Sequence, residues 1–381
     1  TATPAIETYA KAKQLVETDI PYSYSQLVNR VSGHPLPKIT LVDMLTIKQN
    51  GDFSLLSQPL LESMKKHLAN NKKVIILINR RGFSTHISCQ HCGDVLECNG
   101  CGLSFTFHQN KSFHCHRCDI TIPVTNTCPS CKKNRLGFSG IGIQKVELEC
   151  KQHFPDLSVI RLDKDSASTP KIMEEKLNKF KENGDILIGT QMIAKGHHIE
   201  DVTCVGVLGI DTSLNLPDYR SAERAFHLLL QVAGRSGRGK DPGEVIVQSF
   251  QPKHYIFTFS QEHDINGFTE RELQFRQELF YPPYSSMTNL VISSETLEFA
   301  KTYADIVASH LRSHICPLND SILISGPKPA PIEKVRNFYR IQILLKFPGK
   351  KNDKVRELLL SCPKPTKKVR FIIDFSPKQL L

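Results

Sequence analysis

The sequence predicts an α/β fold: a parallel sheet with helices on both faces, interrupted by an inserted two-zinc module with four cysteines per ion and followed by a smaller α+β domain of ferredoxin-like topology. Three observations predict it. Helices and strands alternate along the middle of the chain, four Cys-x-x-Cys pairs lie within 43 residues, and the elements after residue 285 follow a βαββαβ order. A length of 381 residues and a hydrophobic content of 40% are enough for two or three domains with cores of their own.

The alternation of helices and strands predicts the parallel sheet. Apolar positions at helical spacing over 57–70 precede the continuous apolar run 74–78, which is typical of a strand buried on both faces. A helix over 170–183 is supported by a cap residue, a proline at its first position and a glycine beyond its end. The other expected elements are helices over 143–153 and 221–233 and strands over 158–162, 185–189, 202–210 and 244–250.

The last third of the chain predicts a separate domain. A helical linker over 261–280 leads to a break at Tyr281-Pro282-Pro283. The order of the elements beyond this break suggests a ferredoxin-like sandwich. These elements are strands over 287–292, 322–325, 339–347 and 369–375 and helices over 297–313 and 353–360.

The eight cysteines of the four Cys-x-x-Cys pairs predict zinc. Two ligands separated by two residues bind one tetrahedral ion from a tight turn, and two such turns complete a closed site of four cysteines. Disulfides are the alternative, and they fit less well because the chain has no secretory segment and its cysteine repeats are regular. The remaining cysteines are scattered and are expected in the core or on the surface: Cys150, Cys204, Cys316 and Cys362.

Loop lengths favour a nested pairing of the cysteine pairs. The gaps between successive pairs are 5, 13 and 9 residues. Thirteen residues are close to the spacing of a zinc ribbon, whereas five make a stiff closure. A cross-braced pairing of first with third and second with fourth stays open, and four histidines could substitute as ligands: His91, His108, His114 and His116. The expected ligands are Cys89, Cys92, Cys128 and Cys131 at site 1 and Cys98, Cys101, Cys115 and Cys118 at site 2.

The net charge of +11 is concentrated at the end of the chain. Residues 321–381 contain ten Lys and four Arg against four acidic residues, so their charge is 14 − 4 = +10. Such a basic domain is expected of a protein that binds nucleic-acid phosphates, and a solvated Lys-rich surface is the alternative. No stretch approaches the ~20 apolar residues that cross a membrane. Because no signal segment begins the chain, the expected location is cytoplasmic.

Two polar segments are candidates for phosphate chemistry. Residues 231–238, Gln-Val-Ala-Gly-Arg-Ser-Gly-Arg, end a helix, and Arg235 and Arg238 offer planar sets of donors that can stabilise charge on a transferring phosphoryl group. Residues 189–198 begin where a parallel strand ends, which is where open α/β sheets bind ligands. Both segments, together with Asn79-Arg80-Arg81-Gly82, are expected at the same edge of the sheet.

These motifs together resemble a known family. Segment 231–238 is similar to motif VI of superfamily 2 helicases, and segment 189–196 is similar to their motif V. The run 79–83, the cysteine pairs directly behind it, and segments 189–198 and 219–224 are very similar to the primosomal protein N′ (PriA) family of bacterial replication-restart helicases. The likeness covers the whole chain, and Thr1-Ala2-Thr3-Pro4 resembles the motif III that closes the first helicase lobe.

The resemblance implies the second RecA-like lobe of an ATP-dependent DNA helicase that moves 3′ to 5′, recognises stalled forks and D-loops, and promotes reloading of the replicative helicase. The implied catalytic residues are Arg235, Arg238 and Gln231, and the implied DNA or nucleotide-coupling residues are Thr190, Gln191, Lys195 and Gly196. The implied cofactors are two zinc ions per chain, in the nested arrangement, and ATP and Mg in the full-length enzyme. The implied partners are forked DNA and single-stranded/double-stranded junctions, single-stranded DNA-binding protein and other primosome proteins, for a monomer associated with the bacterial nucleoid.

One departure from the family is large. The sequence has no Gly-x-x-x-x-Gly-Lys-Ser/Thr phosphate loop and no Asp-Glu-x-His box, which belong to the family's first lobe. We therefore expect a C-terminal fragment that does not hydrolyse ATP by itself. The alternative function is a non-catalytic zinc-ribbon protein that binds nucleic acid. The expected domains are 1–9 (end of lobe 1), 10–83 (linker and start of lobe 2), 84–139 (zinc insertion), 140–260 (rest of lobe 2), 261–284 (helical linker) and 285–381 (DNA- and partner-binding domain).

Overall fold

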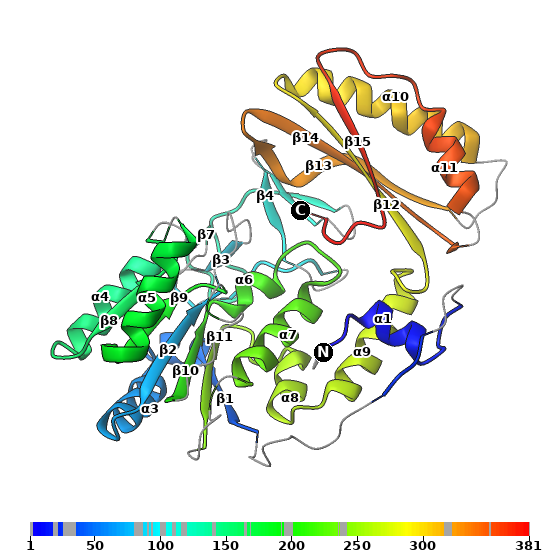
Figure 1. Ribbon diagram of the computed structural model, residues 1–381. Helices are drawn as coiled ribbons and strands as arrows, with labels where there is room; N and C mark the ends of the chain where they lie inside the picture. The colour runs from blue at the N-terminus through cyan, green and yellow to red at the C-terminus, as the bar shows by residue number, and fades with distance from the viewer. Residues whose placement is uncertain are drawn as a thin grey trace.

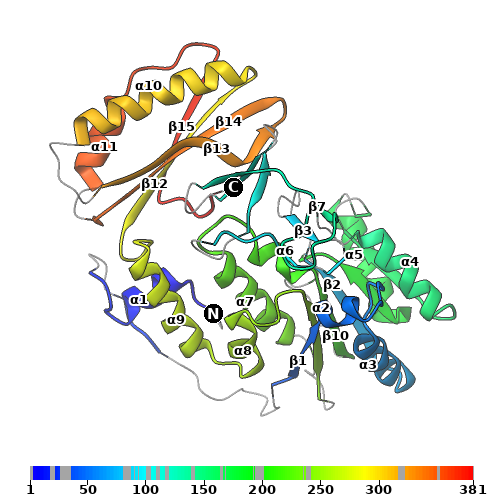
Figure 2. The same cartoon turned by 180° about the vertical axis from the view of Figure 1, so that it is seen from behind.

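The chain folds into an α/β lobe, a small cysteine-rich module and a C-terminal α+β domain (Figure 1). Figure 2 shows from behind that the C-terminal domain presents its sheet, not its helices, toward the lobe. The computed structural model describes residues 3–17, 22–25, 36–79, 87–89, 91–92, 94–99, 104–108, 112–115, 120–138, 142–163, 166–167, 169–191, 193, 201–234, 236, 242–315, 322–349 and 352–380.

The lobe contains a six-stranded sheet in the order β1-β11-β10-β2-β9-β8, and all its pairs are parallel. Its strands are nearly continuous runs of buried aliphatic residues, as parallel strands covered on both faces require. The predicted parallel α/β sheet is therefore confirmed. The strands are β1 (Lys38–Asp43), β2 (Lys73–Ile78), β8 (Val159–Leu162), β9 (Ile186–Gly189), β10 (Val202–Leu208) and β11 (Glu244–Ser249).

Helices cover both faces of this sheet. One core lies between the sheet and α5, α7, α8 and α9, and a second core lies between the opposite face and α2, α3 and α4. Cys150 and Cys204 are buried in the second core, as expected of structural cysteines. The helices are α1 (Ile6–Ala12), α2 (Met44–Gln49), α3 (Gln58–Ala69), α4 (Ile143–His153), α5 (Pro170–Asn183), α6 (Ile210–Leu214), α7 (Ser221–Ala233), α8 (Tyr255–Gln261) and α9 (Ile265–Glu278).

Three details of the lobe differ from the expectation. The strand expected over 202–210 ends at Leu208, because Gly209 has a φ of 72° and starts α6. The linker helix expected over 261–280 is α9, which begins only at Ile265, where the Asp264 carboxylate caps it by accepting a hydrogen bond from Gly267 N at 2.9 Å; a separate helix, α8, precedes it and ends at Gln261. Strand β1 lies in the range expected as linker, and it pairs with β11, some 200 residues later in the chain.

The C-terminal domain has the predicted ferredoxin-like topology. Its antiparallel sheet has the order β13-β14-β12-β15, and two helices pack on one face of this sheet. Strand β13 continues well past the expected end at Ser325, with shifts of register near Pro327 and Pro329 that accommodate these prolines. The elements are β12 (Ser286–Ser294), α10 (Leu297–Ile315), β13 (Leu323–Val335), β14 (Phe338–Phe347), α11 (Asn352–Leu360) and β15 (Arg370–Phe375).

The cysteine-rich module lies between β2 and α4 in the chain, as predicted for an insertion into the lobe. It is built from two small antiparallel sheets. One pairs β3 (Ile87–Cys89) with β7 (Leu136–Phe138), which brings the two ends of the module together. The other contains β4 (Thr106–His108), β5 (Ser112–His114) and β6 (Thr121–Pro123).

A buried cluster of charged side chains joins α1, α7 and α9. The guanidinium of Arg276 on α9 is 2% exposed and donates to the Glu223 carboxylate of α7 at 2.8 Å and to Glu7 of α1 at 3.0 Å. Arg220, which precedes α7, donates to the same Glu7 oxygen at 2.7 Å. Burial opposes the charge on Glu223, but the Arg276 charge and the hydrogen bonds from Ile6 N and Arg276 hold the pKa of that carboxyl below its usual value.

We predict that Arg276→Met destabilises the chain by about 3–5 kcal/mol, because it leaves the buried carboxylate of Glu223 without its partner. Urea unfolding followed by circular dichroism measures the change. Arg271→Met on the same helix is the control, since Arg271 is exposed and its loss is expected to change the free energy of unfolding by about 0.5 kcal/mol or less. Equal effects of the two substitutions would contradict the importance of the cluster.

Candidate functional site

Polar side chains gather at the edge of the sheet where the parallel strands end. Asn79, directly after β2, is buried; its amide donates to Ser213 Oγ and accepts from the Gln191 amide, both at 2.6 Å. Gln191 and the half-buried Thr190 directly follow β9. The structure thus brings two of the predicted segments, 79–83 and 189–198, together through their first residues.

Glycine is required where β9 ends. A Cβ on Gly189 would collide with the backbone carbonyl oxygen of Leu162 on β8 and with the buried side chain of Ile193. The close approach lets the chain turn directly from the strand into Thr190 and Gln191. The predicted contact residues Lys195 and Gly196 lie outside the described residues.

The sequence interpretation missed the polar residues that follow β10 and β11. Asp211 is buried, and its carboxylate accepts from Ser249 Oγ at 2.6 Å and from Phe250 N at 3.2 Å. Burial raises the pKa of this carboxyl. The available signal was the alternation of Asp211, Ser213 and Asn215 directly behind a buried strand. These side chains fix the loops of this edge against one another.

The arginine segment lies at the opposite edge. Ser236 is fully buried and its hydroxyl donates to the carbonyl oxygen of Thr203 at 2.9 Å, while Glu244 O lies 3.4 Å away. Thr203 and Glu244 stand at the starts of β10 and β11. The expectation that segments 189–198 and 231–238 share one edge is therefore wrong, because α7 runs back along the sheet and returns the chain to the edge where the strands begin.

Two connections join these edges. Helix α7 ends at Ala233, with Gly234 as its C-cap and Gln231 exposed in its last turn. The segment from Gly189 to Val202 leaves one edge at the end of β9 and arrives at the other at the start of β10. The predicted catalytic residues Arg235 and Arg238 lie outside the described residues, but Gly234 and Ser236 locate this part of the chain at the edge where the strands begin.

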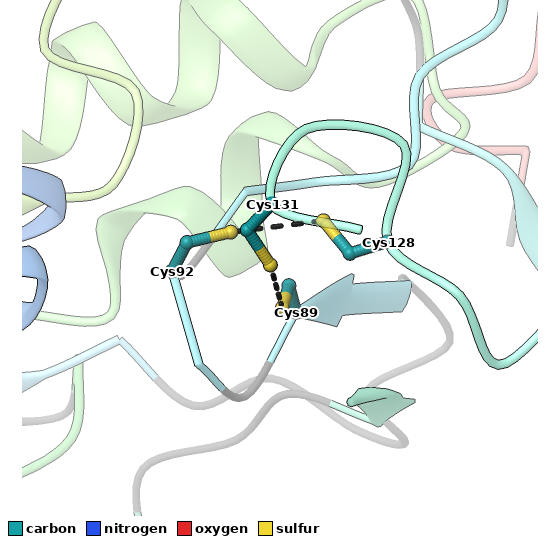
Figure 3. Close-up of side chains that lie close together, drawn as sticks. All are labelled: Cys89, Cys92, Cys128 and Cys131. Carbon is teal, nitrogen blue, oxygen red and sulfur yellow. Dashed lines mark hydrogen bonds between the residues drawn. The ribbon is translucent and has the colours of Figure 1, made fainter. Parts of the chain in front are cut away.

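The outer cysteine pairs form a compact cluster. The sulfurs of Cys89, Cys92, Cys128 and Cys131 lie within 4.8 Å of one another and point inward (Figure 3). Cys89 Sγ is 3.6 Å from Cys131 Sγ, and Cys92 Sγ is 3.6 Å from Cys128 Sγ. A tetrahedral zinc ion with Zn–S bonds of about 2.3 Å holds its sulfurs roughly 3.8 Å apart, whereas a disulfide needs about 2.05 Å. The geometry fits a metal ion, and it groups the cysteines that the nested arrangement assigns to site 1.

The two knuckle turns prepare the sulfurs of this cluster for a metal. In the first, Cys89 N donates to Asp94 O at 2.7 Å, and in the second Cys128 N donates to Lys133 O at 2.9 Å. Burial raises the pKa of the Cys128 thiol, while the backbone N–H of Lys133 lowers the pKa of Cys131 to about 7. Burial disfavours the charged thiolates. A metal ion that binds all four sulfurs would offset this cost, because it binds them as thiolates.

The inner cysteine pairs are described only in part. Cys98 and Cys115 are buried beside Phe105 and Phe113, whereas Cys101 and Cys118 lie outside the described residues. Among the described residues no histidine joins the site 1 cluster. Site 2 and the pairing of its cysteines stay predictions.

The cysteine-rich module is fixed to the lobe at the edge where the strands end. Ser104 Oγ donates to Asn215 O at 2.9 Å, and the Gln251 amide donates to the Glu97 carboxylate at 2.9 Å and to Asn215 Oδ1 at 3.2 Å. Asn215 follows α6, and Gln251 follows β11. The module therefore extends the edge that carries Thr190, Gln191 and Asn79.

Family comparisons agree with this division of the chain. Residues 135–240 match the helicase conserved C-terminal domain, a range that begins within the cysteine-rich module and runs from α4 to the arginine segment. The α/β lobe with its two polar edges is thus the RecA-like C-terminal lobe of a helicase. Residues 277–378 match the primosomal protein N C-terminal domain.

Whole-chain similarity identifies the family. The chain is 38% identical to the replication restart protein PriA of Bacillus subtilis (strain 168) over 91% of its length, and 37% identical to that of Synechocystis sp. over 91%. It is 34% identical to the PriA protein of Rickettsia felis over 99%. The chain belongs to the PriA family of replication restart proteins. It spans about half the length of the curated relatives it matches, 42% of the first two and 57% of the third.

Within the part of the chain that the structure describes, no helix is both long and apolar enough to span a bilayer.

Elemental analysis of the purified chain tests the metal assignment. We expect about two zinc ions per chain for two sites of four cysteines each, and about one after Cys128→Ser, because a three-cysteine site binds zinc weakly. Cys150→Ser, which changes a buried core cysteine away from the cluster, is the control and should leave the zinc content unchanged. An unaltered zinc content in Cys128→Ser would contradict a metal at site 1.

Proposed function

We propose that this chain supplies the second helicase lobe, the zinc module and the DNA-binding C-terminal domain of an ATP-dependent 3′ to 5′ DNA helicase that acts in replication restart. The observation that carries the proposal is the match of residues 135–240 to a helicase lobe whose polar segments lie at opposite edges of one sheet. In this proposal one edge contacts DNA and the other contacts ATP. ATP and Mg are held mainly by a first lobe, which carries the phosphate loop.

The arginine segment is the proposed ATP contact. Arg235 and Arg238 follow a helix whose last turn is anchored by buried Val232 and Ala233, and Ser236 between them is held against two strands. A short loop with fixed ends can keep guanidinium groups in place on the γ-phosphate while charge develops during transfer. Gln231, which is exposed in the last turn of α7, is the third proposed contact of this phosphate.

The edge with Asn79 is the proposed DNA contact. The Gln191 side chain is held by Asn79, so its position is already fixed before a strand of DNA binds. Thr190 beside it offers a hydroxyl to a backbone phosphate, and Lys195 and Gly196 belong to the segment that runs from here toward the ATP edge. A movement at either edge would pass to the other through this segment, which is how we propose that hydrolysis is coupled to movement along DNA.

The zinc module is the proposed wedge between DNA strands. Two zinc ions, one at the Cys89–Cys131 cluster and one at site 2, would keep its short strands rigid. Its attachment through Asn215 and Gln251 places the module directly beside the proposed DNA edge. This placement supports strand separation at a fork or D-loop.

The hairpin between β13 and β14 is the proposed DNA contact of the C-terminal domain. Its turn residues Arg336 and Asn337 have positive φ, which produces a tight turn and leaves Lys334 to Asn337 exposed. The Arg370 guanidinium of β15 lies 4.0 Å from the centre of the Phe338 ring. Basic groups around an aromatic ring are typical of sites that bind single-stranded nucleic acid.

The proposed function also includes partners, an oligomeric state and a cellular location. The partners are forked DNA, single-stranded DNA-binding protein and other primosome proteins, and the outcome is reloading of the replicative helicase at stalled forks. The protein would act as a monomer on the nucleoid, in the bacterial cytoplasm. The names of the relatives support the replication-restart role.

Hydrolysis of ATP by this chain joined to an ATP-binding first lobe tests the function. DNA-stimulated hydrolysis is expected, and Arg235→Ala should lower kcat by on the order of a hundredfold or more, because a transition-state contact is lost. Arg271→Ala, an exposed arginine on α9, should leave the rate unchanged. Absence of hydrolysis, or a rate unaffected by Arg235→Ala, would favour a non-catalytic zinc-ribbon protein that binds nucleic acid.

Fluorescence anisotropy with labelled single-stranded DNA tests the hairpin. Phe338→Ala should weaken binding by roughly tenfold, because one base loses its stacking partner. Arg370→Ala should in addition reduce the slope of log K against log salt by about 1. Lys301→Ala on the exposed side of α10 should change neither quantity if the hairpin is the binding surface.

A further inference from the structure

The five residues after β15 return from the C-terminal domain to the lobe. Arg224 of α7 and Arg220 just before it both donate to the backbone carbonyl oxygen of Lys378, Arg220 at 3.2 Å. The backbone N–H of Leu380 donates to the Asp218 carboxylate at 3.1 Å. Residues 376–380, which we name the return segment, are thus bound at the N-terminal end of α7.

The binding site for the return segment is built for a peptide backbone. The Asp218 side chain is fully buried, and its carboxylate also accepts from Arg224 at 2.9 Å and from Arg220 N at 3.0 Å. Together with the Leu380 N–H, these donors give the buried carboxylate three hydrogen bonds, one of them from a guanidinium. Because the return segment contributes backbone atoms here, the site does not depend on the side chain of Lys378.

An apolar cluster closes over the same segment. Leu380 packs with Tyr281, Met287 and Leu344, and Tyr219 and Leu279 border the cluster. Tyr219 of the lobe stacks on Tyr281 of the linker at 5.1 Å between ring centres. In addition, the Gln342 amide of β14 donates to Leu380 O at 3.4 Å. The return segment therefore contacts the lobe, the linker and the C-terminal sheet at once.

Helix α7 connects this site to the arginine segment. It has 13 residues, so it spans about 20 Å at 1.5 Å per residue. Phe226, Leu229 and Val232 along this helix are buried in the core, and its far end leads to Gly234 and the anchored Ser236. A packed helix moves as a unit, so a shift at Asp218 or Arg224 shifts the end that precedes Arg235.

We propose that the return segment is a latch that couples the C-terminal domain to the arginine segment through α7. Arg224, Asp218 and Leu380 are positioning residues in this account, since they touch neither ATP nor DNA. Closure of the latch fixes the C-terminal domain on the lobe, and DNA bound by that domain thereby favours the position of α7 that hydrolysis requires. This transmission rests on the proposed function, whereas the contact itself does not.

Hydrogen exchange of the chain without ligands tests the contact between the return segment and the start of α7. The amide of Leu380 is expected to exchange slowly, and Arg224→Met should speed exchange over 377–380 by roughly tenfold or more, because it removes the donor to Lys378 O and the partner of Asp218. Lys378→Ala is the matched control: it removes an exposed side chain, keeps the carbonyl and should exchange as the wild type does. Slow exchange retained in Arg224→Met would overturn the latch.

Kinetics of this chain joined to an ATP-binding lobe test the transmission. Leu380→Asp places a carboxylate beside Asp218 and should lower DNA-stimulated kcat by roughly tenfold, a typical coupling between sites. Basal hydrolysis and the Kd for DNA should stay as in Lys378→Ala, whereas a merely structural defect would lower the basal rate as well. Stimulation equal to that of Lys378→Ala would overturn the coupling. If DNA does not stimulate ATP hydrolysis by the wild type, the proposed function is overturned. The hydrogen-exchange experiment would still show whether the return segment is bound to α7.

Discussion

The buried guanidinium of Arg276 is the constraint on which the arrangement of the helices depends. Taking a charge out of water costs several kcal/mol unless partners surround it, so this side chain is stable only where the carboxylates of α1 and α7 meet α9. Helix α1 is far from α7 and α9 in the sequence, and the mutual position of the three helices is set by a few hydrogen bonds of fixed geometry. The start of α7, with Arg220 and Glu223, is thereby held on the side where the linker enters the C-terminal domain.

Helix α7 begins at this fixed position, and its direction determines which edge of the sheet carries the arginine segment. The helix runs back along the sheet and delivers the arginine segment to the edge where the strands begin, while β2, β9 and β10 deliver Asn79, Gln191 and Ser213 to the other edge. Two ligands can then bind one lobe without competing. The cysteine-rich module, attached through Asn215, extends the second edge only. Under the proposed function, this separation would let nucleotide and DNA act on the same rigid body from opposite ends.

Much of this organisation could be predicted from the sequence. The aliphatic run 74–78 and the capped helix 170–183 are local patterns, and both elements are where they were expected. The spacing of Cys89, Cys92, Cys128 and Cys131 pointed to a common site, and the structure brings their sulfurs together because β3 and β7 pair at the ends of the insertion. Local spacing carries this information, since each turn is encoded by neighbouring residues.

What the sequence did not reveal depends on contacts between distant segments. Strand β1 lacks a strong pattern of its own and is defined by its pairing with β11. The edge at which the arginine segment lies follows from the direction of α7 relative to the strands, not from any motif. The return segment is bound through backbone atoms, so the identity of Lys378 gives no signal at all. The same holds for Asp218, whose partner Leu380 N is 162 residues away.

The central claim is that the buried charges at the start of α7 and the contacts around Leu380 join the lobe and the C-terminal domain into one cooperative unit. Differential scanning calorimetry of the wild-type chain tests it most directly. One transition that includes both domains, with equal calorimetric and van't Hoff enthalpies, is the result that this account predicts. Two separate transitions, one for each domain, would contradict it.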